Sequence, residues 1–202
     1  MQVKICGLSH PEEVNFCVKY RADFCGFILN YPKSHRFISF EQAKLLTNLK
    51  KKDTKFVGVL VNATEKELKI YSQLNFDYFQ LYGNYESEDL IKIKRTMNKK
   101  IIIALQIKNQ RDVDNYKKFI NIADIILWDS TGLEKSVGWD FDWIRNIPDG
   151  VTKMIAGNIN FENLEKVSKI ADIVDVSGAL ETNKVKDISK IKKFLDKVRY
   201  YQ

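Results

Sequence analysis

No hydrophobic run in the sequence is long enough to cross a membrane, because none approaches the roughly 18 apolar residues that a spanning helix needs. The chain has only three prolines and nine glycines, and no linker rich in serine, glycine and proline interrupts it. We therefore predict one domain over residues 1–202. The N-terminus leads directly into a strand-like segment and shows no signal peptide. We expect a cytoplasmic protein with no membrane partner.

Cysteine and histidine are also scarce. The three cysteines, Cys6, Cys17 and Cys25, are an odd number without the spacing of a disulfide framework, so no disulfide scaffold is predicted. The two histidines, His10 and His35, are far apart in the sequence, so no zinc site is suggested. We predict no metal centre.

The charge is positive, with 33 basic against 26 acidic residues and a net charge of +7. The basic residues are mostly lysines scattered along the chain. A nucleic-acid-binding protein more often shows clustered arginines interleaved with aromatic residues, so we expect no nucleic-acid partner. A general excess of positive charge would instead help to attract an anionic small molecule.

Short apolar runs alternate with longer amphipathic segments along the whole sequence. Some runs, such as Gly26–Leu29 and Ile101–Leu105, are apolar throughout, as expected of strands buried on both faces. Eight segments are predicted as strands: Gln2–Cys6, Phe24–Leu29, Phe56–Val61, Tyr78–Leu81, Ile101–Gln106, Ile125–Asp129, Thr152–Ala156 and Ile173–Ser177.

The segments between these strands carry helix signals. Ser9-x-x-Glu12, Ser39-x-x-Gln42 and Thr64-x-x-Glu67 all fit the capping box that begins a helix. The segment Asp140–Ile147 is the weakest predicted helix, because it is short. Eight strand–helix units of about 25 residues each predict an α/β fold, a single-domain (β/α)8 TIM barrel. An open doubly wound sheet is the alternative, but the chain lacks the glycine-rich loop that would favour it.

Cys6 and Asp129 each stand at the carboxyl end of a predicted strand, where the active site of a parallel barrel lies. A thiol and a carboxylic acid in these places suggest a base and an acid that face one substrate. Taken singly, each also has an ordinary explanation, since free cysteines are usually buried and aspartates are common in turns.

Small residues follow the last two predicted strands, with Gly157 and Asn158 after the seventh and Ser177 and Gly178 after the eighth. Such residues let backbone N–H groups approach an anion, and these two loops are the usual phosphate site of a barrel. A tight turn that merely needs glycine is the alternative. We predict that these four residues bind a phosphate group.

Two basic residues near the predicted site remain open to two interpretations. Arg36 lies in the long loop after the second strand, where it could clamp a carboxylate or simply face solvent. Lys4 alternates in register with Cys6 and should point the same way, into the barrel. It could pair with a buried carboxylate or form a Schiff base with a substrate.

A series of motifs occurs in order along the chain. They are Lys4-Ile5-Cys6-Gly7-Leu8, Gly26-Phe27-Ile28, Ser34-His35-Arg36-Phe37-Ile38-Ser39, Gln80-Leu81-Tyr82-Gly83-Asn84, Leu127-Trp128-Asp129-Ser130, Phe141-Asp142-Trp143, Ala156-Gly157-Asn158-Ile159 and Val174-Asp175-Val176-Ser177-Gly178. Together they resemble the phosphoribosylanthranilate isomerase family, and the resemblance covers nearly the whole chain.

The resemblance implies a (β/α)8 barrel that performs the third step of tryptophan synthesis, an Amadori rearrangement of N-(5-phosphoribosyl)anthranilate without a metal or organic cofactor. Asp129 would be the acid if burial keeps it protonated. Cys6 would be the base if positive charge, with Lys4 as the candidate, lowers its pKa from about 8.5. The resemblance also implies that Arg36 holds the anthranilate carboxylate and that Asp175 contacts the sugar hydroxyls.

Three positions depart from the family pattern. Lys135-Ser136-Val137-Gly138 replaces a glycine-rich stretch, Asn158 replaces the second glycine of a pair, and Gly178 follows Ser177 where a second serine is usual. In the family the first stretch is flexible, so the first departure concerns the mobility of a lid, and the other two concern phosphate binding. None removes the candidate acid or base.

Two other functions stay open from the sequence. One is a different sugar-phosphate barrel enzyme, such as an aldolase that uses Lys4. The other is a catalytically silent barrel that binds a partner. For the isomerase, the expected partner is a small sugar-phosphate substrate, and the chain is expected to be a monomer or a homodimer.

Overall fold

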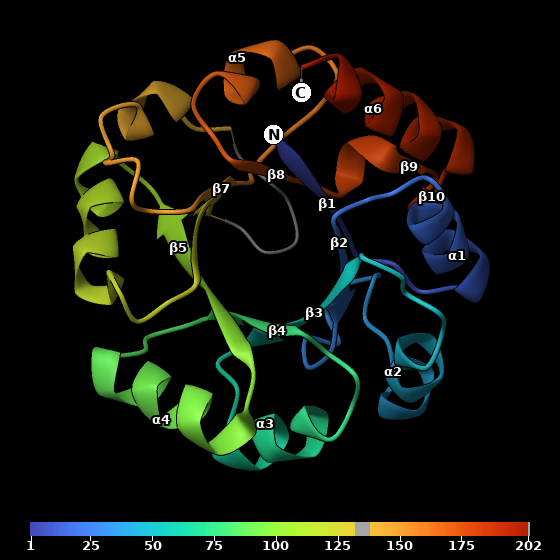
Figure 1. The fold of residues 1–202 in the computed structure, drawn as a ribbon, viewed down its shortest axis with the longest axis horizontal. Coiled ribbons are helices and arrows are strands. Elements are labelled where there is room, and N and C mark those ends of the chain that lie inside the picture. Colours follow the sequence, from blue (N-terminus) through green and yellow to red (C-terminus); the bar gives the residue numbers. More distant parts are fainter. Residues whose placement is uncertain (132–137, 202) are drawn as a thin grey trace.

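Eight parallel strands close into a barrel in the computed structural model, which describes residues 1–131 and 138–201 (Figure 1). This confirms the predicted fold class. The strands are β1 (Gln2–Cys6), β2 (Phe24–Ile28), β3 (Lys55–Val61), β4 (Tyr78–Tyr82), β5 (Lys100–Ile107), β6 (Ile125–Ser130), β7 (Lys153–Ile155) and β8 (Ile173–Val176). All eight coincide with predicted strands to within two residues at each end, because continuous apolar runs mark strands that are buried on both faces.

Helices surround the barrel as an outer layer (Figure 1). The helical segments are α1 (Pro11–Lys19), α2 (Phe40–Thr47), α3 (Glu65–Ser72), α4 (Ser87–Met97), η1 (Gln110–Phe119), η2 (Phe141–Ile144), α5 (Leu164–Ser168), η3 (Gly178–Leu180) and α6 (Ile188–Tyr200). The three η segments are 3-10 helices. The segment predicted as the weakest helix, Asp140–Ile147, is therefore a 3-10 turn. A short hairpin of β9 (Glu181–Thr182) and β10 (Val185–Lys186) also follows β8.

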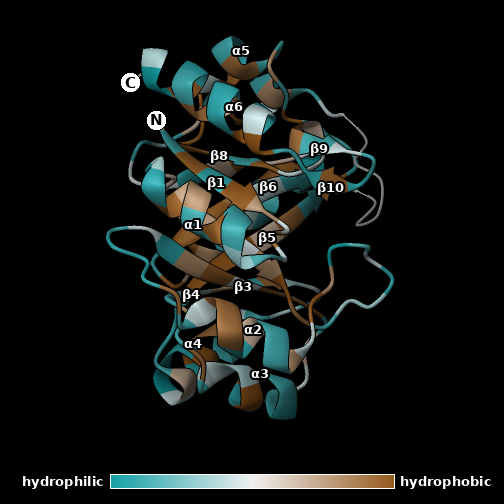
Figure 2. Ribbon diagram, turned by 90° about the vertical axis from the view of Figure 1, so that its right-hand side faces the viewer, coloured by the Kyte–Doolittle hydropathy of each residue, from teal (hydrophilic) through white to brown (hydrophobic). Residues whose placement is uncertain are grey.

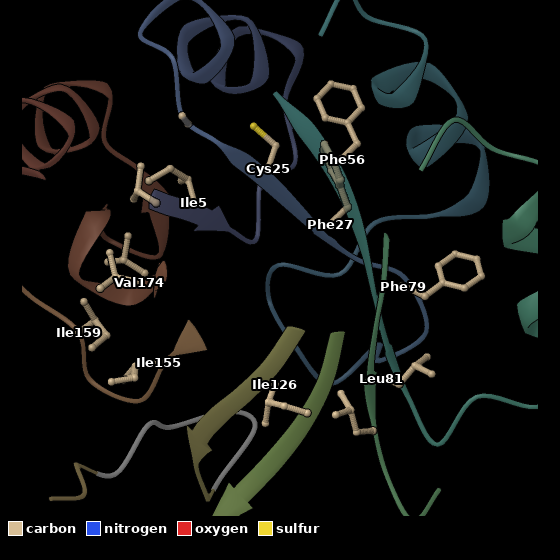
Figure 3. Close-up of a cluster of buried hydrophobic side chains, with 14 of the residues drawn as sticks. Ile5, Cys25, Phe27, Phe56, Phe79, Leu81, Ile126, Ile155, Ile159 and Val174 are labelled. Atoms are coloured by element: carbon tan, nitrogen blue, oxygen red, sulfur yellow. The ribbon is translucent and has the colours of Figure 1, made fainter. Parts of the chain in front are cut away.

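Side chains alternate across each strand and form two apolar layers. The larger layer lies between the strands and the helices. Figure 3 shows part of this layer, including Ile5, Cys25, Phe27 and Val174. The smaller layer fills the barrel interior and includes Cys6. In side view the strands are largely hydrophobic and the helices carry more of the hydrophilic surface (Figure 2). Alternation thus turns the even-numbered residues of β1, Lys4 and Cys6, towards the barrel axis.

The helix starts agree with the capping predictions in part. Thr64 and Glu67 form the predicted capping box at α3, and Ser39 caps α2 by accepting the Gln42 N–H. The prediction for α1 was wrong, because this helix begins one residue later than expected. There the Glu13 carboxylate accepts the N–H groups of Ser9 and His10, so the pair Ser9 and Glu12 forms no box.

Four aspartates stand just before the even-numbered strands, at the amino-terminal end of the barrel. Each carboxylate accepts a backbone N–H from the start of the preceding odd-numbered strand, at 2.7 or 2.8 Å. The pairs are Asp23 with Val3, Asp77 with Phe56, Asp124 with Ile101, and Asp172 with Lys153. These bonds join neighbouring strands at the end of the barrel opposite the predicted site. Within the described part of the chain, none of the helices is long and apolar enough to span a membrane.

Candidate active site

A cavity of about 570 Å³ opens at the carboxyl ends of the strands. A volume of this size is typical of a small-molecule site. All eight residues that the sequence nominated line this cavity: Cys6, Arg36, Asp129, Gly157, Asn158, Asp175, Ser177 and Gly178. Residues from the ends of the strands and from the loops that follow them thus meet in one place, as closure of the barrel requires.

Cys6 is the last residue of β1 and is 9% exposed. It pairs in register with Gly26 on β2. A Cβ atom at Gly26 would lie 2.9 Å from the Cys6 Sγ and 3.0 Å from the Lys4 Nζ. The missing side chain at Gly26 therefore makes room for both the thiol and the ammonium inside the barrel.

Lys4 is fully buried and bonded to Asp175, with 2.7 Å between Nζ and Oδ2. The two residues are register partners across β1 and β8. Burial acts to lower the pKa of Lys4, but the charges of Asp175 and Cys6 and their hydrogen bonds outweigh it and hold the pKa above its ordinary value. A Schiff-base lysine must be neutral to attack a carbonyl, so this pairing argues against the aldolase alternative.

The pKa of the Cys6 thiol is raised above its ordinary value. Burial is the main cause, and the nearby positive charge of Lys4 opposes it without overcoming it. The sequence-based expectation of a lowered thiol pKa was therefore wrong for the unliganded protein. The physical reason is that desolvation of a fully enclosed thiolate exceeds the attraction of a lysine whose charge is shared with Asp175.

Asp129 stands near the end of β6 with both carboxyl oxygens hydrogen-bonded. Oδ1 accepts the Ser130 N–H at 2.7 Å, and Oδ2 accepts the Tyr82 hydroxyl at 2.6 Å. Burial raises the pKa of Asp129 to about 6, although the hydrogen bond from Tyr82 acts in the opposite direction. A carboxyl with such a pKa is protonated far more often near neutral pH than an exposed aspartate, as a general acid requires.

Sequence reasoning missed two residues of β4 that face the same cavity, Gln80 and Tyr82. The Gln80 Nε2 donates to the Tyr82 Oη at 3.1 Å. Among the described residues, the Gln80 Oε1 and the Asp175 Oδ1 are buried without a hydrogen-bond partner. The available signal was a pair of polar residues two apart in an otherwise apolar buried strand, which places both on the inner face.

Arg36 lines the cavity, but its guanidinium already holds a carboxylate of the protein. Nε and Nη2 donate to the two oxygens of Glu181 at 2.5 and 2.9 Å. Burial acts to raise the pKa of Glu181, but hydrogen bonds and charges from Arg36 and Lys186 lower it to about 2. Gly7, with φ of +77°, leaves room for the arginine, since a Cβ there would lie 2.4 Å from the Arg36 Cδ. Glu181 was not predicted as a partner of Arg36, because the β9–β10 hairpin was not predicted.

One of the two loops nominated for phosphate, the loop after β7, has the left-handed backbone that suits this role. Gly157 and Asn158 have φ of +91° and +60°, so Asn158 adopts the left-handed conformation expected of a glycine substitute. In the other loop, the Ser177 Oγ donates to the Cys6 carbonyl at 2.9 Å, and the Lys186 Nζ lies 3.1 Å from the Ser177 Oγ. The altered stretch at residues 135–137 lies outside the described residues.

Comparisons with known proteins agree on one family. A family model described as N-(5'phosphoribosyl)anthranilate (PRA) isomerase matches residues 3–197. A curated relative, the N-(5'-phosphoribosyl)anthranilate isomerase of Thermoanaerobacter pseudethanolicus, is 36% identical over 207 residues, which cover 98% of each chain.

Solved structures give the same result. The phosphoribosyl anthranilate isomerase of Thermotoga maritima matches with a TM-score of 0.88 and 31% identity, and the match covers 99% of both chains. A second structure, of a phosphoribosyl anthranilate isomerase in complex with reduced 1-(o-carboxyphenylamino)-1-deoxyribulose 5-phosphate, has a TM-score of 0.86 and 30% identity over 99% of both chains.

Proposed function

Since this chain belongs to the N-(5'-phosphoribosyl)anthranilate isomerase family, we propose that Cys6 and Asp129 are the general base and the general acid of its reaction. The enzyme converts N-(5-phosphoribosyl)anthranilate into 1-(2-carboxyphenylamino)-1-deoxyribulose 5-phosphate, an aldose-to-ketose isomerisation in tryptophan biosynthesis. The observation that carries the assignment is the presence of a buried thiol and a partly buried carboxyl, the latter with a pKa of about 6, in one cavity.

The first step is opening of the furanose ring. Asp129 transfers its proton to the ring oxygen as the bond between C1 and that oxygen breaks. The lone pair of the anthranilate nitrogen forms the C1=N bond of an iminium. The substrate nitrogen thus accepts the positive charge. The Asp129 carboxylate that remains is stabilised by the N–H of Ser130 and the hydroxyl of Tyr82.

The second step is removal of the proton at C2. The Cys6 thiolate takes this proton, the C–H electrons form a C1=C2 double bond, and the C=N electrons return to nitrogen. The resulting enaminol gains a proton at C1 and loses the proton of its C2 hydroxyl, which gives the ketone. The raised pKa of Cys6 makes its thiolate scarce but strongly basic, and the buried ammonium of Lys4 stabilises that thiolate.

The remaining cavity residues would hold the two ends and the middle of the substrate. The Nε and Nη2 groups of Arg36 bind Glu181, so the opposite edge of its guanidinium would bind the anthranilate carboxylate. Asp175 presents its unpartnered Oδ1 to a sugar hydroxyl. At the other end, the backbone of Gly157, Asn158 and Gly178 would bind the phosphate, as the positive φ of the first two and the place of all three after β7 and β8 favour.

Alkylation of Cys6 with iodoacetamide tests this placement. The reagent should inactivate the enzyme with label on Cys6, and reduced 1-(o-carboxyphenylamino)-1-deoxyribulose 5-phosphate should protect it. Cys17 and Cys25 are buried under the helices and provide internal controls. Equal labelling of Cys6 with and without the protecting compound would contradict its assignment to the substrate site.

A further inference from the structure

Asp129 receives a hydrogen bond from a side chain two strands away in the barrel. Tyr82 ends β4, Asp129 is near the end of β6, and the Tyr82 Oη lies 2.6 Å from the Asp129 Oδ2. The tyrosine is only 7% exposed and lines the substrate cavity. The bond is therefore partly buried, and it involves the carboxyl oxygen that is not bonded to the backbone.

The direction of this bond is set by a third residue. A phenol has one proton, and the Tyr82 Oη accepts the Nε2 N–H of Gln80 at 3.1 Å. Its own proton is then directed to Asp129. Gln80 precedes Tyr82 by two residues on the same strand, so both side chains lie on the inner face. Gln80, Tyr82 and Asp129 thus form a chain of donors that ends on the carboxyl group.

We propose that Tyr82 is a positioning residue that aims the acid proton of Asp129 and stabilises the carboxylate formed when that proton reaches the substrate. This inference rests on the proposed role of Asp129 as the acid. With Oδ1 bonded to Ser130, the free lone pair of Oδ2 is the position that can carry a proton towards the cavity. Tyr82 fixes that orientation and strengthens its bond as negative charge develops on Asp129.

The pH dependence of the reaction should change when the Tyr82 hydroxyl is removed. A hydrogen bond donated to a carboxylate favours its charged form, so loss of the Tyr82 hydroxyl should raise the pKa of Asp129 above about 6. Lys4 and Asp175 also face Asp129, and Cys6 faces Tyr82. These three groups remain unchanged in a variant at position 82, so a change in pH dependence belongs to the tyrosine.

The experiment compares the pH profiles of kcat/KM for the purified wild type, Tyr82→Phe, and a protein with 3-fluorotyrosine in place of Tyr82. The transition near pH 6 should move up by about one pH unit in Tyr82→Phe, with kcat reduced by about tenfold, the effect of one lost hydrogen bond. It should move down with 3-fluorotyrosine, whose phenol is a stronger donor. Because fluorotyrosine keeps the hydroxyl, this arm gives a result even if Tyr82→Phe does not fold.

Tyr71→Phe is the matched control. Tyr71 is also buried, and its hydroxyl donates to the Leu29 carbonyl at 2.6 Å, outside the cavity. This variant should leave the transition in place. If the transition stays fixed in both Tyr82 proteins while Asp129→Asn abolishes it, the inference on Tyr82 is wrong and the acid assignment stands. If Asp129→Asn also keeps the transition, the acid assignment itself fails.

Discussion

Lys4 and Asp175 form a fully enclosed ion pair, with 2.7 Å between Nζ and Oδ2, across the seam where β1 meets β8. Lys4 lies two residues before Cys6 on the inner face of β1, and its charge is the largest effect that opposes the burial of that thiol. The barrel seam thus has both a structural and an electrostatic role. Separating these two roles requires variants that remove the charge of Lys4 without leaving the Asp175 carboxylate buried and unpaired.

Replacement of Lys4 by Met should lower both stability and activity. It leaves the Asp175 carboxylate buried without its partner, which typically costs about 3–5 kcal/mol in the free energy of unfolding. The double variant Lys4→Met with Asp175→Leu should regain most of that stability but none of the activity, because Cys6 still lacks the positive charge and the substrate loses the contact proposed for Asp175. Urea denaturation and kcat measure the two effects. Recovery of activity in the double variant would show that Lys4 does not assist Cys6.

The pH profile of kcat/KM should carry the signature of two groups that need opposite protonation states. Reaction requires protonated Asp129, with a pKa of about 6, and ionised Cys6, with a pKa raised above the ordinary thiol value. The form with Asp129 protonated and Cys6 ionised is a minor species at every pH. Its fraction rises with pH until Asp129 begins to ionise, stays level, and falls only after Cys6 has ionised.

The acidic limb of the wild-type profile therefore reports Asp129, although Asp129 acts as the acid. In Asp129→Asn this limb near pH 6 should disappear, and the small residual activity should keep rising with pH until Cys6 ionises. An Asp129→Asn profile that retains its limb near pH 6 would assign that limb to another group.

Asn158 should tolerate glycine but not valine. Its φ of +60° is accessible to asparagine and glycine, whereas a β-branched residue is strained there. Asn158→Gly should leave KM for the substrate within a few-fold of wild type, and Asn158→Val should raise it by at least tenfold. Competitive inhibition by inorganic phosphate provides a second readout. Equal effects of the two substitutions would remove Asn158 from the phosphate site.

The aspartates at the base of the barrel should contribute stability and not catalysis. Asp172→Ala removes the acceptor of the Lys153 N–H and should cost about 1–3 kcal/mol in the free energy of unfolding. Asp172→Asn keeps an oxygen acceptor and should lose less. Because the bond lies at the end of the barrel opposite the cavity, kcat should be unchanged in both. A variant that loses kcat in proportion to stability would show that the two ends of the barrel are coupled.

The sequence predicted the barrel and most of its site because both depend on local patterns. Apolar runs mark the strands, and the residue that ends each run faces the cavity once the barrel closes, which placed Cys6 and Asp129 together. The helical layer after β5 and β6 was less predictable, because η1 and η2 are 3-10 segments whose form depends on packing.

Contacts between distant segments could not be predicted from the chain. Glu181 meets Arg36 only because the β9–β10 hairpin folds back over the loop after β2. Tyr82 meets Asp129 only because β4 and β6 curve around the same interior. The sign of the Cys6 pKa shift depends on a balance between burial and the Lys4 charge, and spacing along the chain does not give that balance.

The most direct test of the account is the turnover of N-(5-phosphoribosyl)anthranilate by the purified chain and by Cys6→Ala, followed through the loss of substrate fluorescence. The wild type should turn over the substrate without a partner protein. Cys6→Ala should keep its fold, seen as an unchanged circular dichroism spectrum, and lose kcat by about 10²–10⁴, the usual contribution of a positioned base. A folded Cys6→Ala protein with near-normal kcat would contradict the assignment of Cys6 as the base.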